Sequence, residues 1–260
     1  MDLFGWQVPG QPYLEVCEAC VDNESNFQSF KHNPQFNGIL EHASKENGDR
    51  YIQFISELSN FETDIVPSLD GWRRNDENGG TVKYDYPLYG TFSPTTLSYI
   101  YNYYRMKQYI PDIDSLKNIV EIGGGYGGQC YVISQKVKFN SYTIFDLKEV
   151  TRLQSKYLKR LDIENVQCLY PETFSEFQDK PIDLIISTFA WSELSRNVQL
   201  YYFMTYISKA KHGFFRCNLC YSGLTRDELV TLFQGAGFPN LHVGQDEMYP
   251  PDNSTVVFYW

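Results

Sequence analysis

The stretch Asn118-Ile119-Val120-Glu121-Ile122-Gly123-Gly124-Gly125-Tyr126-Gly127-Gly128 decides the fold of this chain. It predicts a short apolar strand that ends near a carboxylate and is followed by five glycines within six positions. A backbone without Cβ atoms can turn sharply there and approach a ligand closely. A helix and a second strand ending at Asp146 are expected next. The agreement of these features favours a nucleoside site over a glycine-rich turn without a ligand.

Two kinds of nucleoside site share this pattern. Gly123-x-Gly125-x-x-Gly128, with Asp146 eighteen residues further on, matches the fingerprint of NAD(P)-binding folds. Glu121-x-Gly123-x-Gly125-x-Gly127 resembles motif I of the S-adenosylmethionine (SAM) dependent methyltransferases of Rossmann-like fold. Glu121 favours SAM, because a carboxylate so close to the glycines can position the methionine end of SAM but disfavours a pyrophosphate. The formal net charge of -10 also favours SAM, a sulfonium cation, over an anionic dinucleotide.

From Leu116 onward the chain alternates predicted strands and helices, as in an α/β sheet. The expected strands are 118–122, 141–145, 165–169, 182–187, 212–218, 240–245 and 254–259, the last one antiparallel. The expected helices are 127–137, 148–160, 195–210 and 225–236. We therefore predict an α/β fold in which residues 116–260 form a Rossmann-like, seven-stranded SAM methyltransferase core with helices on both faces of the sheet.

The preceding residues, 1–115, are expected to form a mainly helical N-terminal region or lid. Ser93 and Pro94 predict a helix start, since serine caps free amides and proline suits the first turn. The Asp, Asn and Gly residues of 68–80 predict a loop.

Four segments carry a narrower resemblance. They are Tyr89-Gly-Thr-Phe-Ser-Pro-Thr-Thr-Leu97, Val120-Glu-Ile-Gly-Gly-Gly-Tyr-Gly-Gly-Gln129, Phe145-Asp146-Leu147 and Ser187-x-x-Ala190-x-Ser192-Glu193-Leu194. Together they resemble the sugar O-methyltransferase family of bacterial and viral glycan-modification clusters, over residues 87–260. The resemblance implies SAM-dependent methylation of a hydroxyl on a glycan sugar, for example a terminal deoxyhexose such as rhamnose. Two alternatives stay open: methylation of a small molecule or peptide, and a SAM-binding subunit without activity.

The cofactor-binding residues are expected at the strand ends. Backbone approach is assigned to Gly123, Gly125 and Gly127, and the methionine end to Glu121. Asp146 can accept both ribose hydroxyls in bidentate fashion, although it can also serve as a helix N-cap. Adenine is expected between Leu147 and Tyr170. Ser187 completes the cofactor set, whereas Tyr126 is either a cofactor contact or a packed helix residue.

The catalytic candidate is Glu193. Methyl transfer to a hydroxyl benefits from a general base, and this carboxylate follows the predicted strand 182–187 at the rim where methyltransferases of this kind present catalytic groups. Its apolar neighbours should raise its pKa if it is partly buried. Glu193 can instead be an ordinary acid at a helix N-terminus. In that case either another group, such as Asp246, His32 or His42, accepts the proton, or positioning of the hydroxyl alone suffices.

Composition excludes several classes of partner. The pI near 4.9 and the absence of a Lys/Arg cluster argue against a nucleic-acid partner. The apolar runs are too short for a membrane span, and the N-terminus lacks a signal peptide, so a cytoplasmic protein is expected. Cys17-x-x-Cys20 and Cys217-x-x-Cys220 lack the turn glycines of a zinc knuckle, so no metal is expected. The 21 tyrosines and 18 phenylalanines suit a sugar-binding cleft, an aromatic core or a homodimer surface.

Overall fold

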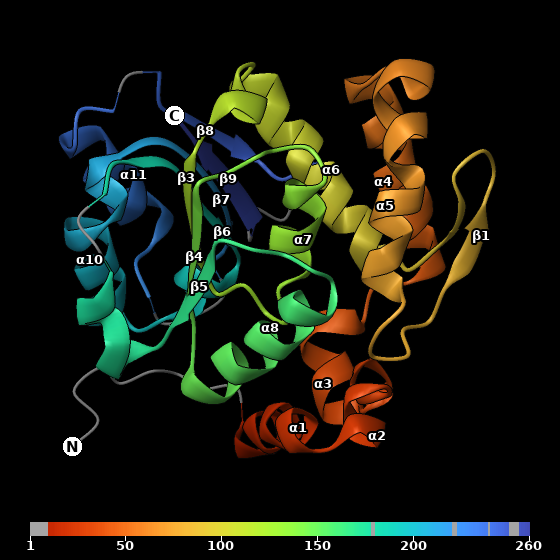
Figure 1. Cartoon of the computed structure of the whole chain (residues 1–260). Helices are drawn as coiled ribbons and strands as arrows, with labels where there is room; N and C mark the ends of the chain where they lie inside the picture. Colours follow the sequence, from red (N-terminus) through yellow and green to blue (C-terminus); the bar gives the residue numbers. More distant parts are fainter. Residues whose placement is uncertain (1–9, 178–179, 220–222, 239, 250–254) are drawn as a thin grey trace.

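A seven-stranded sheet forms the centre of the molecule (Figure 1) in a computed structural model that describes residues 10–177, 180–219, 223–238, 240–249 and 255–260. The strand order is β5-β4-β3-β6-β7-β9-β8. The strands are β3 Asn118–Ile122, β4 Ser141–Phe145, β5 Val166–Leu169, β6 Ile182–Thr188, β7 Ala210–Asn218, β8 His242–Gln245 and β9 Thr255–Tyr259. β9 runs antiparallel to both of its neighbours, β7 and β8, and the other neighbouring strands described in this sheet pair in parallel. The predicted fold class and the antiparallel last strand are both confirmed.

The central strands are mostly buried because helices cover both faces of the sheet. In β3 four of the five residues are buried. The register pairs Ile122 with Phe145 and Glu121 with Ile186, so β3, β4 and β6 end at nearly the same level. This common edge is where an open α/β sheet binds its ligands.

The helices form two layers around the sheet (Figure 1). α10 and α11 cover one face; α6, α7 and α8 cover the other, and α4 and α5 lie outside this second layer. The helices are α1 Gln11–Asp22, α2 Glu24–Phe27, α3 Pro34–Phe36, α4 Lys45–Leu58, α5 Leu69–Arg73, α6 Pro94–Tyr109, α7 Gly128–Ser134, α8 Lys148–Arg160, α9 Ala190–Glu193, α10 Arg196–Thr205 and α11 Arg226–Gly235. Short 3-10 or π turns are η1 Phe30–His32, η2 Asn37–Glu41, η3 Phe61–Ile65, η4 Val66–Ser68, η5 Arg74–Asp76, η6 Ile113–Ser115, η7 Pro171–Glu176 and η8 Ile207–Lys209. None of the helices in the described ranges has the length and apolar character needed to cross a bilayer.

The N-terminal region is mainly helical, with one hairpin formed by β1 Tyr84–Tyr86 and β2 Gly90–Phe92. Ser93 caps α6 as expected, accepting a hydrogen bond from the Thr96 amide at 3.0 Å. The expected loop 68–80 is wrong for residues 69–76, which form α5 and η5. Burial explains the difference, because Leu69 and Trp72 pack into the core and override the loop-forming composition around them.

One hydrophobic cluster joins the N-terminal helices to the sheet face under α6, α7 and α8. It contains Phe27 and Trp72 from the N-terminal region together with Ile144 and Leu184 from the sheet. A second cluster fills the opposite face, under α10 and α11. A domain boundary at 115/116 stays a prediction.

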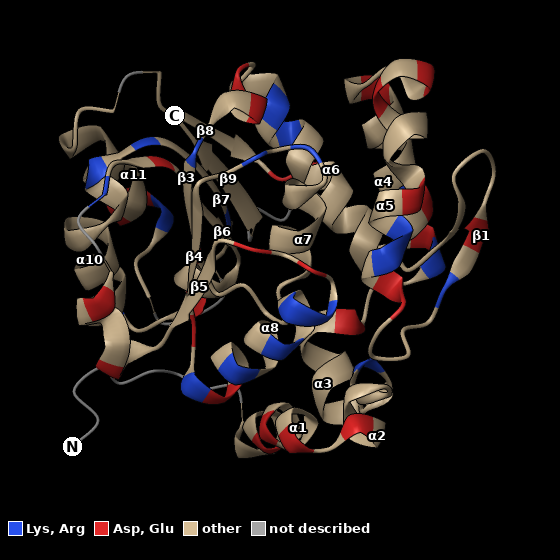
Figure 2. Cartoon of the chain, in the orientation of Figure 1, with Lys and Arg blue, Asp and Glu red and all other residues tan. Residues whose placement is uncertain are grey.

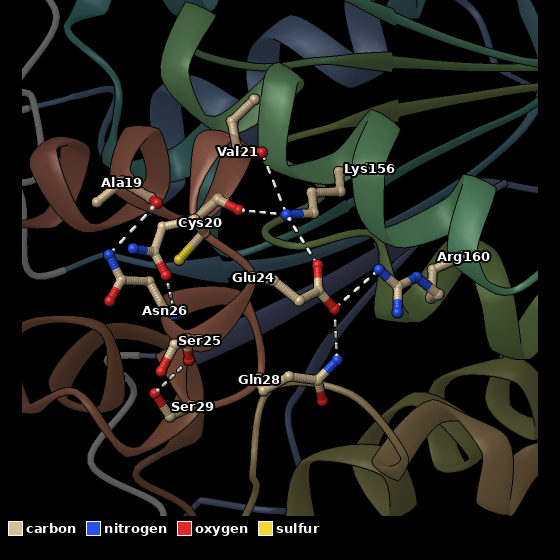
Figure 3. Close-up of polar contacts among 11 residues, drawn as sticks. Ala19, Cys20, Val21, Glu24, Ser25, Asn26, Gln28, Ser29, Lys156 and Arg160 are labelled. Carbon is tan, nitrogen blue, oxygen red and sulfur yellow. Dashed lines mark hydrogen bonds and ion pairs between the residues drawn. The ribbon is translucent and has the colours of Figure 1, made fainter.

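Polar contacts hold α1 and α2 against α8 (Figure 3). Lys156 Nζ donates to the carbonyl oxygens of Cys20 and Val21 at 2.8 and 3.1 Å, so it caps the end of α1. Glu24 at the start of α2 accepts from Arg160 Nη2 at 2.8 Å. Figure 2 shows Lys and Arg along α8 beside Asp and Glu on α1 and α2. The basic side chains of Arg152, Lys156 and Arg160 on α8 therefore face acidic side chains of the same chain.

Candidate cofactor site and active site

A cavity of about 770 Å³ lies at the carboxyl ends of β3, β4, β6 and β7. Residues from the strand ends form its floor, and the N-terminal segment 10–42 contributes one wall. The lining residues are Gly10, Tyr13, Gly38, Ile39, Leu40, His42, Ile122, Gly123, Gly125, Phe145, Asp146, Leu147, Thr188, Phe189, Ala190, Glu193, Leu194, Asn218, Tyr249 and Thr255. Its position is the one that the sheet topology predicts for a ligand site.

The glycine loop forms the bend between β3 and α7. Gly123 has φ +75° and Gly125 has φ +56°, conformations that L side chains rarely adopt. A Cβ on Gly123 would lie 2.0 Å from the Cβ of Ala190, and one on Gly125 would lie 3.1 Å from Leu40 Cδ1. Gly127, at φ +97°, is the N-cap residue before α7 and is not part of the described cavity lining. Gly123 is thus required for close packing against α9, and Gly125 for close packing against the N-terminal segment, even before a ligand binds.

Asp146 lies on the cavity wall at the end of β4. Its Oδ1 accepts from the Leu147 amide and its Oδ2 from Gln154 Nε2, both at 2.8 Å. Burial raises the pKa of this carboxyl to about 7, although these hydrogen bonds act in the opposite direction. The same Gln154 Nε2 also donates to the Gly125 carbonyl oxygen at 2.8 Å. One buried amide therefore fixes the distance between the ribose-binding candidate and the glycine loop.

Glu121 lies beneath the glycine loop and not on the cavity wall. Its side chain is 1% exposed, and Oε2 accepts from the Tyr142 hydroxyl at 2.7 Å. Burial raises the pKa of Glu121 to about 7, the Tyr142 hydrogen bond lowers it, and the nearby Asp146 charge raises it further. A Cβ on Gly124 would lie 3.4 Å from the Glu121 carboxyl, so this carboxyl lies directly behind the loop. Its assignment to the methionine end of SAM stays a prediction.

Of the predicted cofactor residues Leu147, Tyr170 and Ser187, one lines the cavity and two are not part of its described lining. Leu147 lines the cavity, whereas the described lining does not include Tyr170, which follows the neighbouring strand β5. Ser187 is buried and ties strand ends together: its hydroxyl donates to the Ile122 carbonyl at 2.9 Å and accepts from the Trp191 amide at 3.0 Å. Direct contact of Tyr170 or Ser187 with the cofactor stays a prediction.

Tyr126 takes the packing role that the sequence left open. Its side chain is fully buried, and its ring contacts those of Tyr157 and Phe30 at centroid distances of 4.9 and 5.9 Å. The ammonium group of Lys31 lies 4.1 Å from the Tyr126 ring centroid. The side chain therefore points away from the cavity and anchors the glycine loop to the N-terminal region.

Glu193 lies at the end of the short helix α9, on the β6–β7 side of the cavity. Burial raises its pKa. Across the described residues no hydrogen bond or ion pair to the Glu193 carboxylate is found, so its oxygens remain open to a ligand in the cavity. The structure thus brings Glu193 and Asp146, predicted from separate motifs, into one cavity.

The alternative proton acceptors differ in position. His42 lines the cavity from the N-terminal segment, whereas His32 is not part of the described lining. Asp246 is buried in an ion pair with Arg216, with Oδ2 and Nε 2.6 Å apart. The negative charge of its carboxylate is therefore already paired with a positive charge.

The structure shows no group of three or more His, Cys, Asp or Glu side chains arranged for a metal ion within the ranges it describes. Cys17 and Cys20 are buried in α1, and Cys217 is buried in β7. Cys220, the second cysteine of the other predicted pair, lies outside the described residues.

Sequence reasoning missed Gln154 and the aromatic side chains Tyr13, Phe189 and Tyr249. Gln154 carried a readable signal, because it is a large polar residue on the mostly apolar buried face of α8. For Phe189 and Tyr249 the sequence offers only aromatic character, which is shared with many core residues. Tyr13 comes from a segment without any recognisable motif.

Solved structures with a similar fold include SAM-dependent methyltransferases. One from Clostridium acetobutylicum matches with a TM-score of 0.50 at 8% identity, covering 61% of this chain and 89% of the other. An rRNA methylase from Streptococcus thermophilus matches at 0.44 and 12% identity, covering 61% and 94%. TrmK of M. capricolum with bound S-adenosyl-homocysteine (SAH) matches at 0.42 and 12% identity, covering 60% and 66%.

Neither a protein-family model nor a curated protein matches the sequence. The family beyond the fold is thus not assigned by similarity. The strand order, the glycine loop and the structural neighbours agree that this chain has the fold of the class I SAM-dependent methyltransferases.

Proposed function

We propose that this protein is a SAM-dependent O-methyltransferase that acts on a hydroxyl group of a glycan sugar, with Glu193 as the general base. The observation that carries the proposal is the position of Glu193. Its partly buried carboxylate faces the same cavity as the glycine loop and Asp146, with no described partner to occupy its oxygens. The proposed proton acceptor and the proposed nucleoside site thus line one cavity.

The strand order supports the placement of the cofactor. Asp146 and Leu147 lie at the end of β4, the glycine loop lies at the end of β3, and β6 follows next in the sheet. Neighbouring strands are about 4.8 Å apart, so three strand positions span roughly 10 Å. An adenosine over β4 would extend its methionine part over β3 and towards β6. The raised pKa of Asp146 fits this assignment, because ribose hydroxyls would provide hydrogen bonds that the buried carboxylate lacks.

When bound, SAM supplies an activated methyl group. The acceptor oxygen forms a bond to the methyl carbon as the carbon–sulfur bond breaks, and SAH is the second product. Glu193 accepts the hydroxyl proton, which a carboxylate with a raised pKa does more effectively than an ordinary one. The cavity walls hold the hydroxyl in line with the reacting bond, a positioning effect that accounts for a large part of such catalysis.

The resemblance of the sequence segments and the chemistry of the cavity wall support a sugar as the acceptor. Beyond Glu193 the wall carries two aromatic rings, Phe189 and Tyr249, and the neutral polar groups of Asn218 and Thr255. Such a surface offers apolar faces for sugar C–H groups together with hydrogen-bonding partners for hydroxyls. An acceptor with a negative charge would be repelled by Glu193.

The test measures SAH formation from SAM with methyl α-L-rhamnopyranoside as the acceptor. We expect Glu193→Gln to lower kcat by about two orders of magnitude while the SAM dissociation constant changes little, because the shape is kept and the proton acceptor is lost. Glu62→Gln, at an exposed position on η3, is the matched control.

The outcomes separate the alternatives. Turnover of peptides or small aromatic acceptors, but not of sugars, would contradict the sugar assignment. SAM binding without turnover of any acceptor would indicate a subunit without activity. Normal turnover by Glu193→Gln would reject Glu193 as the base.

A further inference from the structure

We infer that Phe189 and Tyr249 form an aromatic corner that recognises the acceptor by its ring. This inference rests on the proposed function, because it concerns the acceptor half of the same cavity. With the cofactor over β4 and β3, the space left for an acceptor lies over the ends of β6 and β7. The side chains of Phe189 and Tyr249 both line the cavity there.

The two rings meet nearly at right angles. Their centroids are 6.0 Å apart and their planes differ by 89°. Tyr249 is 39% exposed, a high value for a large side chain inside a cavity wall. A corner of this kind offers one face and one edge to a flat or chair-shaped ring, and aromatic side chains bind both by dispersion and C–H contacts.

The backbone of Phe189 is strained. Its φ of 75° and ψ of -46° are close to those of the classic γ-turn, a rare conformation outside glycine. Three hydrogen bonds maintain it: the Phe189 amide donates to the Arg216 carbonyl at 2.7 Å, and its own carbonyl accepts from the Ser192 amide and hydroxyl at 2.9 and 2.6 Å. Strain that the surroundings hold so firmly is typical of ligand-binding positions. Here it directs an aromatic ring towards the acceptor space.

A buried ion pair positions both rings from behind. The Arg216 guanidinium is 2% exposed and lies 4.9 Å from the Phe189 centroid and 5.9 Å from the Tyr249 centroid. Its partner Asp246 accepts from the Met248 amide at 3.0 Å, and the Tyr249 amide donates to the Asp246 carbonyl at 3.1 Å. The ion pair therefore fixes the turn that presents Tyr249 as well as the ring of Phe189.

The consequence is selectivity for a cyclic acceptor without a negative charge. A ring can fill both sides of the corner at once, whereas an acyclic polyol with the same hydroxyl groups pays more conformational entropy and covers less of the aromatic surface. Glu193 on the adjacent wall disfavours anions. Phe189 and Tyr249 act here as specificity-determining residues, and neither takes part in proton transfer.

The experiment compares methyl α-L-rhamnopyranoside with the acyclic L-rhamnitol, both titrated against the SAH-loaded protein and followed by saturation-transfer NMR. We expect the ring compound to bind more tightly than the polyol. Tyr249→Ala and Phe189→Gly should each weaken ring binding by roughly tenfold and leave polyol binding unchanged. Glycine is chosen at position 189 because it tolerates the positive φ, and Tyr249→Phe should retain binding. Tyr201→Ala, an exposed tyrosine on α10, is the control.

Unchanged ring binding in Tyr249→Ala and Phe189→Gly would overturn the inference. So would an equal loss of SAH affinity, which would place the rings in the cofactor half. Failure of methyl rhamnoside, methyl glucoside and phenol to bind the loaded wild-type protein would also overturn it. Ring binding that depends on both side chains, but without methyl transfer, would reject only the proposed function. Methyl transfer with an unchanged KM in both variants would reject only the aromatic corner.

Discussion

SAH affinity should depend on pH through Asp146. The carboxyl group has a pKa of about 7 in the protein without ligand, because burial outweighs the hydrogen bonds from Leu147 and Gln154. Ribose hydroxyls donate to the ionised form, so binding lowers this pKa and releases a proton below pH 7. The fraction of ionised Asp146 rises from roughly one tenth at pH 6 to nine tenths at pH 8. SAH should therefore bind about tenfold more tightly at pH 8 than at pH 6, a difference of about 1.4 kcal/mol in binding free energy.

Calorimetry at pH 6, 7 and 8, in buffers with different ionisation enthalpies, measures both the affinity and the released proton. Asp146→Asn should weaken binding at pH 8 by roughly 10- to 150-fold, the cost of losing hydrogen bonds to a charged group. It should also reduce the pH slope. Glu121 has a similar pKa and interacts with Asp146, so any remaining slope should disappear in Glu121→Gln/Asp146→Asn. His42→Gln controls for the imidazole on the cavity wall.

The reasoning has a second consequence for stability. A carboxyl whose pKa is higher in the native than in the unfolded protein binds its proton more tightly when folded, so the free energy of unfolding falls as pH rises from about 4 to 7. The ligand-free Asp146→Asn protein should lose part of this fall. Wild-type SAH affinity that is constant from pH 6 to 8, without proton release, would refute the assignment of Asp146 to the ribose.

Two further predictions concern packing around the site. Gly123→Ala should lower the free energy of unfolding by about 2 kcal/mol or more, because the new Cβ meets the Ala190 Cβ at 2.0 Å and the φ is positive. Thermal denaturation measures this loss of stability. The control Gly235→Ala, at a position with open space around it, should not show the loss. Lys156→Met should remove the cap of α1 and speed amide hydrogen exchange in α1 and α2, at a cost of about 1 kcal/mol. Exchange at the wild-type rate would show that apolar packing alone holds these helices.

The sequence determined the sheet and the edge of the sheet at which the cavity lies. Strand and helix periods between Leu116 and Trp260 predicted all seven strands, and α8 begins and ends as expected. These features are local, since the burial of a strand on both faces or of a helix on one face is written into a short run of residues. Other ends shifted: α7 stops at Ser134, and α10 stops at Thr205 before the 3-10 turn η8.

The cavity-lining residues were predictable to the extent that motif and strand end coincide. Asp146, Gly123 and Gly125 line the cavity because their positions follow directly from the ends of β3 and β4. Tyr126 and Ser187 belong to the same motifs but point into the protein. Only the packing around a turn decides which side of the chain faces a ligand, and spacing along the sequence does not contain that information.

Tertiary structure alone decided the rest of the cavity. Leu40 and His42 come from a segment without a motif, yet they lie across the sheet edge because α1 and α2 dock on α8. Phe189 faces the cavity because its backbone donates a hydrogen bond to β7 and accepts from α9, which holds a backbone angle that its own residue type disfavours. A sequence pattern states which faces must be covered. Which distant residues cover them is settled only when the whole chain finds its lowest free energy.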